Sequence, residues 1–206
     1  LYGFHNFLDY CDKCETKKII IASSSSVYSD LQKGSFKESD LLKPRSLYAS
    51  TKIYNENYSR IFAELKQINL IALRFFTVFG SWGRPDMAYY LFLKKIMKDE
   101  EITLFNRGEM SRDMTHIFDI VDGIKLTINY ALETKESFES FNLGNNKPIR
   151  TMKLIKFLEK NLSKKAILNF KDSSNESIKT HANLEKSQLL LGYKPKISFS
   201  EGMQEF

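Results

Sequence analysis

The feature that most constrains the fold is a strand, a helix and a second strand in direct succession. Residues 18–22 contain an apolar, β-branched run that stops at four consecutive serines, which is typical of a buried parallel strand. Residues 47–67 follow Ser46, a favourable helix N-cap, and carry apolar side chains at helical spacing. Residues 70–76 are again largely apolar. This order predicts a crossover unit between two parallel strands of an α/β sheet.

Hydroxyl, phenol and ammonium groups stand where such a unit would bind a ligand. Ligands of open α/β sheets lie outside the carboxyl ends of the strands, and Ser24 and Thr77 each follow such an end. Tyr48 and Lys52 are four residues apart on the predicted helix, so they share one face. Tyrosine is protonated at neutral pH because its pKa is ~10, but a nearby ammonium favours the phenolate. The pattern predicts Tyr48 as a general base supported by Lys52. The alternative is an exposed tyrosine and a solvated lysine.

The rest of the chain continues the α/β pattern without an internal repeat. Helical periodicity and stop signals predict helices over residues 1–15, 89–98, 117–132, 151–162 and 183–191. Short strands are expected at 103–105 and 138–143, and loops at 29–45, 80–88 and 171–180.

Four segments, taken in order, resemble one known family. Residues 22–28 are similar to the serine-rich segment of sugar-nucleotide epimerases in the extended short-chain dehydrogenase/reductase superfamily. Residues 74–88, with Arg-Phe-Phe-Thr-Val-Phe-Gly and Trp-Gly-Arg-Pro-Asp-Met-Ala, most closely resemble UDP-glucuronate 4-epimerases. Residues 112–117 and 141–145 are similar to that family's Arg-Asp-Phe-Thr-Tyr-Ile and Tyr-Asn-Ile-Gly-Asn motifs. A Tyr-x-x-x-Lys pair alone is a weak signal, whereas the ordered set is a strong one.

The resemblance implies a fold and its division into domains. The fold would be α/β, with the C-terminal part of a doubly wound, Rossmann-type parallel sheet and a smaller α/β substrate-binding domain. Residues 1–78 would be the C-terminal half of the NAD-binding domain, and residues 114–145 would return to it. Residues 79–206 would otherwise form the sugar-nucleotide domain.

The resemblance also implies an activity for the full-length protein. NAD would be the cofactor and a UDP-sugar the substrate of a cytoplasmic isomerase, and a homodimer is compatible with the family. The reaction would be 4-epimerisation of a nucleotide-linked hexuronic acid, UDP-glucuronate to UDP-galacturonate, through a transient 4-keto intermediate. Another UDP-hexose is the alternative substrate.

Catalytic and cofactor roles are implied in the same way. Ser24 would share the proton of the substrate O4 with Tyr48, and Ser25 is the alternative within the serine run. Lys52 would also bond the nicotinamide ribose. The cofactor would contact Tyr48, Lys52, Ser23 and Phe75, and core packing is the alternative role for Phe75.

Substrate contacts complete the site that the resemblance implies. Thr77 and the serine cluster would hold the hexuronic carboxylate, with Arg84 adding positive charge, and Arg112 would form a fork on the UDP pyrophosphate. The predicted set is Ser25, Ser26, Thr77, Arg84 and Arg112. The alternatives are loop solvation for Arg84 and an ion pair with Asp113 for Arg112. Related dehydratases carry Asp-Glu in place of Ser25-Ser26, and two serines cannot supply the acid and base that elimination of water requires.

Two positions depart from the family pattern. Ser29 stands where the family has glycine, and residues 173–176 read Ser-Ser-Asn-Glu in place of Arg or Gln followed by Pro-Gly-Asp. The contacts of residues 171–180 with the nucleotide are therefore left unassigned.

Composition and charge argue against several other classes. The net charge is +6, but Lys and Arg are scattered among Asp and Glu, so we expect a cleft for an anionic sugar nucleotide and no nucleic-acid partner. No apolar run approaches the ~20 residues that span a bilayer, and we expect no membrane partner. Cys11 and Cys14 have no second pair to complete a zinc site, and the three histidines are isolated, so no metal is expected.

The glycines point to a truncated enzyme. None of the nine glycines stands in the Gly-rich strand-to-helix turn that binds a pyrophosphate. We therefore expect an N-terminally truncated fragment that is inactive and does not bind NAD when isolated. The non-enzymatic alternative is an interaction module.

Overall fold

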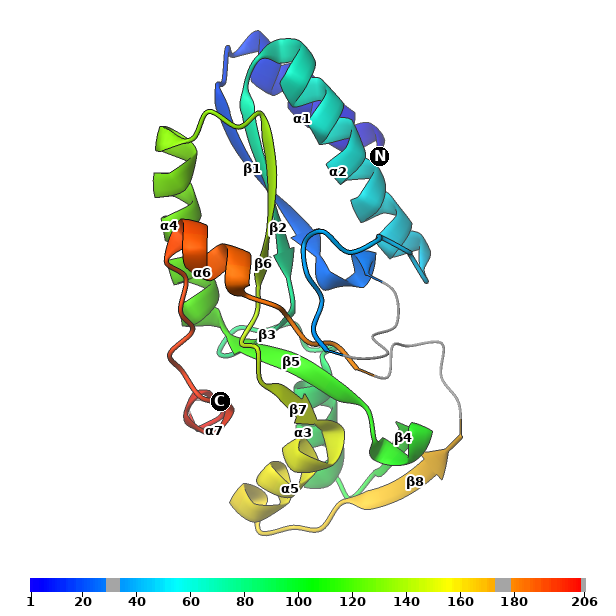
Figure 1. The fold of residues 1–206 in the computed structure, drawn as a ribbon. Coiled ribbons are helices and arrows are strands. Elements are labelled where there is room, and N and C mark those ends of the chain that lie inside the picture. The colour runs from blue at the N-terminus through cyan, green and yellow to red at the C-terminus, as the bar shows by residue number, and fades with distance from the viewer. Residues whose placement is uncertain (29–33, 173–178, 205–206) are drawn as a thin grey trace.

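The computed structural model describes residues 1–28, 34–172 and 179–204 and shows the predicted α/β fold with parallel strands (Figure 1). The helices are α1 (Tyr2–Lys13), α2 (Leu47–Lys66), α3 (Ala88–Met97), α4 (Ile117–Glu133), α5 (Thr151–Leu162), α6 (Glu185–Leu191) and α7 (Phe199–Gly202). The strands are β1 (Lys18–Ser24), β2 (Asn69–Phe75), β3 (Thr77–Phe79), β4 (Glu101–Phe105), β5 (Ser111–His116), β6 (Phe138–Leu143), β7 (Pro148–Arg150) and β8 (Ile167–Lys171). Among these described helices, none is long and apolar enough to cross a bilayer.

A parallel sheet in the order β1-β2-β6 forms the upper part of the molecule in Figure 1. Helices α1 and α2 cover one face of this sheet, and α4 and α6 cover the other. The central strand β2 places Leu70 and Ala72 in the core beneath α1 and α2, and Ile71 and Leu73 in the core beneath α4. A strand covered on both faces has a continuous apolar run, which is why this one could be predicted.

The other strands form two smaller sheets, β3-β5-β7 and β4-β8. β3 is parallel to β5, β7 is antiparallel to β5, and β4 is parallel to β8. Helices α3 and α5 pack against these strands through one apolar core, which includes Tyr89, Ile96, Ile102, Leu154 and Leu158. This core is separate from the two that cover the first sheet.

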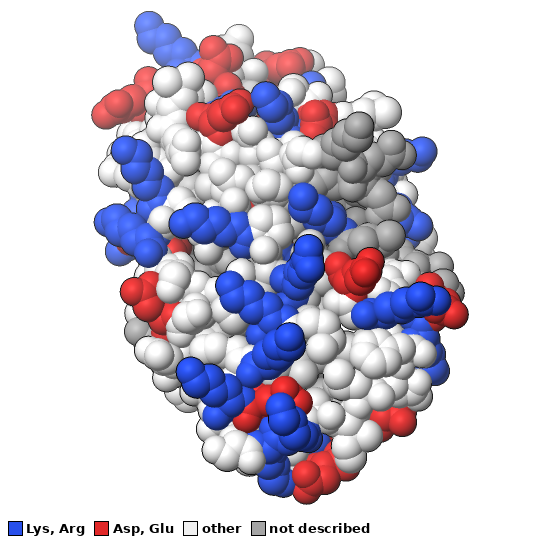
Figure 2. All heavy atoms as spheres, turned by 60° about the horizontal axis from the view of Figure 1, so that its bottom comes forward, with Lys and Arg blue, Asp and Glu red and all other residues white. Residues whose placement is uncertain are grey.

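Positive charge is concentrated between β7 and β8. Residues 147–172 contain eight Lys and Arg and two Asp and Glu, so their net charge of +6 equals that of the whole chain. Figure 2, which brings forward the end of the molecule where α5 and β8 lie, shows Lys and Arg side chains gathered on that face. The expectation that basic residues are scattered among acidic ones is therefore wrong for this segment.

The predicted helices and strands are present with small shifts at their ends, but the sequence pattern did not indicate β3, β5, β7, β8 or α7. The residues of β5, Ser-Arg-Asp-Met-Thr-His, show neither an apolar run nor alternation, and β3 and β7 have three residues each. Such strands depend on their tertiary partners rather than on local propensity. The expected loops at 29–45 and 171–180 lie partly outside the described residues, as do Ser29 and residues 173–176.

The chain crosses between the two groups of strands more than once. β6 pairs with β2, so residues 138–143 return to the first sheet after β3, β4 and β5. Helix α6 then packs against β6 and α4. The predicted division into domains, with its boundary at residue 78 and the return of residues 114–145 to the first domain, stays a prediction.

We expect Gly144→Ala to lower the free energy of unfolding by about 1–3 kcal/mol, the usual effect of overpacking a core. A Cβ at this position would lie 2.5 Å from the Cβ of Ala182, which is itself fully buried. Gly3→Ala is the matched control, because nothing lies within 4 Å of a Cβ built there. Urea unfolding curves measure both variants, and equal stability of the two would contradict the prediction.

Candidate active site

A hollow of about 600 Å³ lies at the carboxyl ends of β1 and β2, where the topology predicts ligand binding. Six of the predicted site residues line it: Ser24, Ser25, Tyr48, Phe75, Thr77 and Arg84. The structure thus brings together residues from β1, α2, β2 and β3. Four other predicted residues, Ser23, Ser26, Lys52 and Arg112, are not in its lining.

The serine run turns from β1 into a 3-10 helix, Ser25–Val27, and this turn separates the roles of the four hydroxyls. The Oγ of Ser24 accepts hydrogen bonds from the backbone N–H of Ser26 at 3.2 Å and from the Ser26 hydroxyl at 2.9 Å. Ser24 lines the hollow, and the two hydrogen bonds from Ser26 hold its hydroxyl in place. Ser26 does not line the hollow, and its substrate contact stays a prediction.

Ser23 points away from the hollow. Its side chain is buried, and its hydroxyl donates to the carboxylate of Glu56 on α2. Successive residues of a strand face opposite sides of the sheet, so the side chains of Ser23 and Ser24 point in opposite directions. The cofactor contact of Ser23 stays a prediction.

Tyr48 and Lys52 share one face of α2 near its N-terminus. The helix begins after Ser46, whose hydroxyl accepts a hydrogen bond from the N–H of Ala49 at 3.1 Å. The Tyr48 side chain is 55% exposed and lines the hollow. The Nζ of Lys52 lies 5.7 Å from the centre of the Tyr48 ring and donates to the carbonyl of Ala22 at 2.8 Å. A phenol and an ammonium therefore lie side by side next to the end of β1.

Arg84 lines the hollow but its charge is already paired. The Nε of Arg84 lies 3.0 Å from one carboxylate oxygen of Asp86, and an Nη donates to the other. This fork lowers the pKa of the Asp86 carboxyl below its ordinary value and raises the pKa of Arg84. Both side chains are largely exposed, so the pair can open toward a ligand at little energetic cost.

A second hollow of about 440 Å³ adjoins the first, and Arg112 and Arg150 are among its lining residues. The two hollows share Thr77, Met87 and Tyr89. Thr77 thus stands at their junction. Tyr48 and Arg84 line the first hollow, and Arg112 and Arg150 line the second.

The residue after Arg112 fastens this part of the site to the fold. The buried carboxylate of Asp113 accepts hydrogen bonds from the backbone N–H groups of Asn145 at 2.7 Å, Asn146 at 3.0 Å and Ala182 at 2.8 Å. Burial raises the pKa of Asp113, and these hydrogen bonds oppose the shift. The carboxylate ties β5 to the segments after β6 and before α6 while Arg112 lines the hollow.

Sequence reasoning missed four residues of the site and its support. Met87 and Tyr89 line both hollows, and Met87 falls inside the motif at 74–88 that carries the resemblance. Glu56 and Arg74 form a buried ion pair and line neither hollow. In the sequence, Arg74 is a charged residue in an otherwise apolar strand, and Glu56 lies one helical turn after Lys52. These are the signals that could have indicated the pair.

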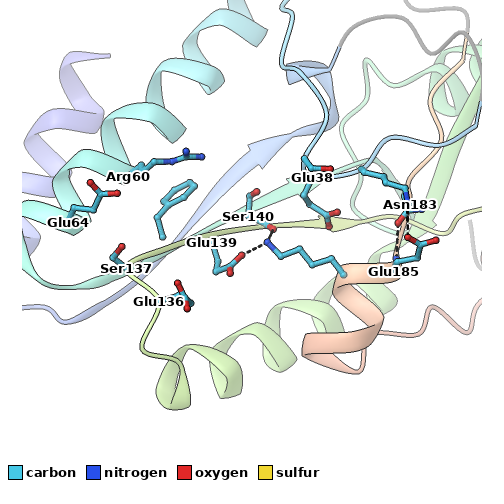
Figure 3. A pocket seen from close by; sticks show the side chains of 13 residues that line it. Glu38, Arg60, Glu64, Glu136, Ser137, Glu139, Ser140, Asn183 and Glu185 are labelled. Atoms are coloured by element: carbon cyan, nitrogen blue, oxygen red, sulfur yellow. Dashed lines mark hydrogen bonds and ion pairs between the residues drawn. The ribbon is translucent and has the colours of Figure 1, made fainter.

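A separate hollow of about 560 Å³ lies at the edge of β6, and none of the predicted site residues lines it. Figure 3 shows its charged lining, in which Lys186 pairs with Glu139 and Lys37 pairs with Glu185. The carboxylate of Glu38 accepts the outward N–H of Asn142 at 2.8 Å. These side chains occupy the open edge of the strand, which is how natural sheets prevent pairing with another chain.

The fold and the hollow define a class of protein. A parallel sheet with a serine at one strand end and a Tyr-x-x-x-Lys helix beside it is the arrangement of the extended short-chain dehydrogenase/reductase enzymes. Residues 2–144 match the NAD dependent epimerase/dehydratase family, and the chain belongs to it. The predicted family is therefore confirmed, and NAD is the cofactor that the family's description names.

Individual relatives narrow the comparison. UDP-glucuronate 4-epimerase 4 of Arabidopsis thaliana is 39% identical over 220 residues, which cover 99% of this chain and 50% of that protein. Uncharacterized protein MJ1055 of Methanocaldococcus jannaschii is 45% identical over 206 residues, covering 99% of this chain and 62% of that protein. The crystal structure of UDP-glucuronic acid 4-epimerase from Bacillus cereus, in complex with UDP-glucuronic acid and NAD, aligns with a TM-score of 0.88 at 33% identity, covering 98% and 64% of the two chains. The chain thus spans between 50% and 64% of these relatives.

Proposed function

We propose that the gene product carrying this chain catalyses the NAD-dependent 4-epimerisation of UDP-glucuronate to UDP-galacturonate. The observation that carries the proposal is the meeting of Ser24, Tyr48 and Thr77 in the lining of one hollow, with Lys52 beside Tyr48. The named substrate of the plant and bacterial relatives supports the choice of a hexuronic acid.

The residues present fit the nicotinamide end of NAD. Phe75 offers an aromatic surface in the hollow, and the ammonium of Lys52 can donate to a ribose hydroxyl when it leaves the Ala22 carbonyl. When bound, NAD supplies the acceptor and donor of a hydride at C4 of the sugar. The chain's own residues supply proton transfer and orientation.

Three side chains, those of Tyr48, Lys52 and Ser24, would take part in proton transfer. Tyr48 would remove the proton from the substrate O4, with the Lys52 ammonium 5.7 Å from the centre of its ring. The Ser24 hydroxyl, held by its bonds to Ser26, would hydrogen-bond O4 as the proton moves. After the 4-keto sugar has turned its other face, the same tyrosine returns the proton.

The two adjoining hollows favour one direction for the substrate. The sugar would occupy the hollow with Tyr48, and the nucleotide would extend past Thr77 into the hollow with Arg112. An arginine at that end suits a diphosphate because its planar fork matches phosphate oxygens.

The test is a comparison of nucleotide sugars with the purified gene product and NAD. UDP-glucuronate, UDP-glucose and UDP-N-acetylglucosamine are incubated separately, and the C4 epimers are separated by chromatography. We expect the highest kcat/KM with UDP-glucuronate. A higher value with UDP-glucose would overturn the uronate assignment but leave the epimerase assignment intact.

Thr77→Val should reduce kcat/KM for UDP-glucuronate roughly ten- to a hundred-fold. A hydrogen bond to a charged group is worth about 1.5–3 kcal/mol, and each 1.4 kcal/mol is about tenfold. UDP-glucose has no carboxylate, so its kcat/KM should change far less and serves as the internal control. Equal losses on the two substrates would show that Thr77 supports the sugar ring or the fold.

A further inference from the structure

A buried polar network joins helix α2 to the three strands β1, β2 and β6 of the first sheet. Its centre is the ion pair between Glu56 on α2 and Arg74 on β2, whose side chains are each 3% exposed. The Nε of Arg74 lies 3.0 Å from one carboxylate oxygen and an Nη lies 2.7 Å from the other, so the pair is bidentate. The hydroxyl of Ser23 on β1 donates to the same carboxylate.

The remaining donors of Arg74 extend the network to the loop after β1 and to β6. Its second Nη donates to the hydroxyl of Tyr28 at 2.8 Å and to the carbonyl of Glu38 at 3.0 Å. The Tyr28 hydroxyl in turn donates to the side-chain oxygen of Asn142 at 2.7 Å. The guanidinium also lies 5.0 Å from the centre of the Tyr28 ring. All three nitrogen atoms of the guanidinium therefore have hydrogen-bond partners.

A buried ion-pair network of this kind adds little to the net free energy of unfolding. The desolvation of two buried charges roughly cancels their attraction, and well-packed apolar replacements are often neutral or stabilising. The network's distinctive property is therefore its geometry. Bidentate arginine pairing fixes both distance and orientation.

Two residues of the network lie next in sequence or one helical turn away from the proposed catalytic residues. Glu56 follows Lys52 by one helical turn and Tyr48 by two, so all three lie on one side of α2. Ser23 immediately precedes Ser24. One carboxylate thus joins the helix that carries Tyr48 and Lys52 to the strand that carries Ser24.

We propose that Glu56 and Arg74 are positioning residues that set the distance between Tyr48 and Ser24. The inference rests on the proposed function, since it concerns the same proton transfer. The network fixes the first half of α2 against β1 and β2, and the hydrogen bond from Lys52 to Ala22 adds a second attachment one turn earlier.

The test uses the double variant Glu56→Leu/Arg74→Met, which replaces both charges by apolar side chains and leaves neither charge unpaired. We expect it to fold and to lose at least tenfold in kcat with KM changed less than about threefold. In a Tyr48→Phe background the same double substitution should have little further effect, because residues that act as one unit are not additive. The control is Asp12→Leu/Lys66→Met, which removes an exposed ion pair at the other end of α2 and should leave kcat unchanged.

A second measurement is independent of activity. Amide hydrogen exchange should accelerate in the first half of α2 in the double variant and stay unchanged in the control. If wild-type protein converts no UDP-glucuronate, the proposed function fails, and hydrogen exchange alone then decides the positioning role. Arg74→Lys, which keeps the charge but not the fork, replaces the double variant if that does not fold. The proposal would be overturned if the variant kept both the kcat and the hydrogen exchange of the wild type. It would also be overturned if its loss of kcat added fully to the loss caused by Tyr48→Phe.

Discussion

Tyr48→Phe should lower kcat for UDP-glucuronate epimerisation by about 10²–10⁴-fold, the usual contribution of a positioned acid–base group. The substitution removes one hydroxyl and keeps the ring, whose side chain is 55% exposed at the hollow. The free energy of unfolding should therefore stay the same within about 0.5 kcal/mol, as for other exposed positions. Single-turnover kinetics and urea unfolding on the same protein separate the two effects.

Tyr10→Phe is the matched control for this experiment. Tyr10 is another exposed tyrosine, on α1, and it does not line the hollow that Tyr48 lines. Loss of the Tyr10 hydroxyl should leave both kcat and the free energy of unfolding unchanged. If Tyr48→Phe kept more than about a tenth of the wild-type kcat, Tyr48 would not be the base, because the loss would be too small for acid–base catalysis.

The second large effect concerns stability rather than rate. Asp113→Ala should lower the free energy of unfolding by about 3–5 kcal/mol. The carboxylate accepts three backbone N–H groups, and each buried donor left without a partner costs about 1–3 kcal/mol. Three separated segments of the chain lose their common attachment at once, so guanidinium unfolding should show a clear shift of the midpoint.

Asp122→Ala provides the comparison. Asp122 is an exposed aspartate on α4 that pairs with Lys125 at 3.5 Å, and exposed pairs contribute at most about 1 kcal/mol. A loss below about 1 kcal/mol for Asp113→Ala would mean that water satisfies the three N–H groups. The role of Asp113 as an anchor for the Arg112 side of the site would then fall.

The parts of the fold that could be predicted from sequence are those with local signals. β2 has a long apolar run and α2 has a cap and a helical period, so both were found with nearly correct ends. β5 carries mostly polar residues because its side chains serve the site and the anchor of Asp113, and no local pattern reveals it. Its formation depends on β3 and β7, which are distant in sequence.

The same distinction applies to the site. The spacing of Tyr48 and Lys52 needs only helix geometry, so their common face could be predicted. The roles of Ser23 and Ser26 depend on where β1 ends, and a shift of one residue reverses the side of the sheet that a residue faces. The pairing of Glu56 with Arg74 needs the packing of α2 on β2, which no spacing in one sequence specifies.

The basic segment between β7 and β8 has a consequence for the rate at which a ligand arrives. Arg150 belongs to this segment and also lines the hollow with Arg112, so an approaching polyanion meets a positive field before it meets the pocket. That field extends about 8 Å at physiological ionic strength and contracts as salt is added. Capture of an anionic ligand would therefore slow in high salt, whereas proton transfer at Tyr48 between groups already in contact would not.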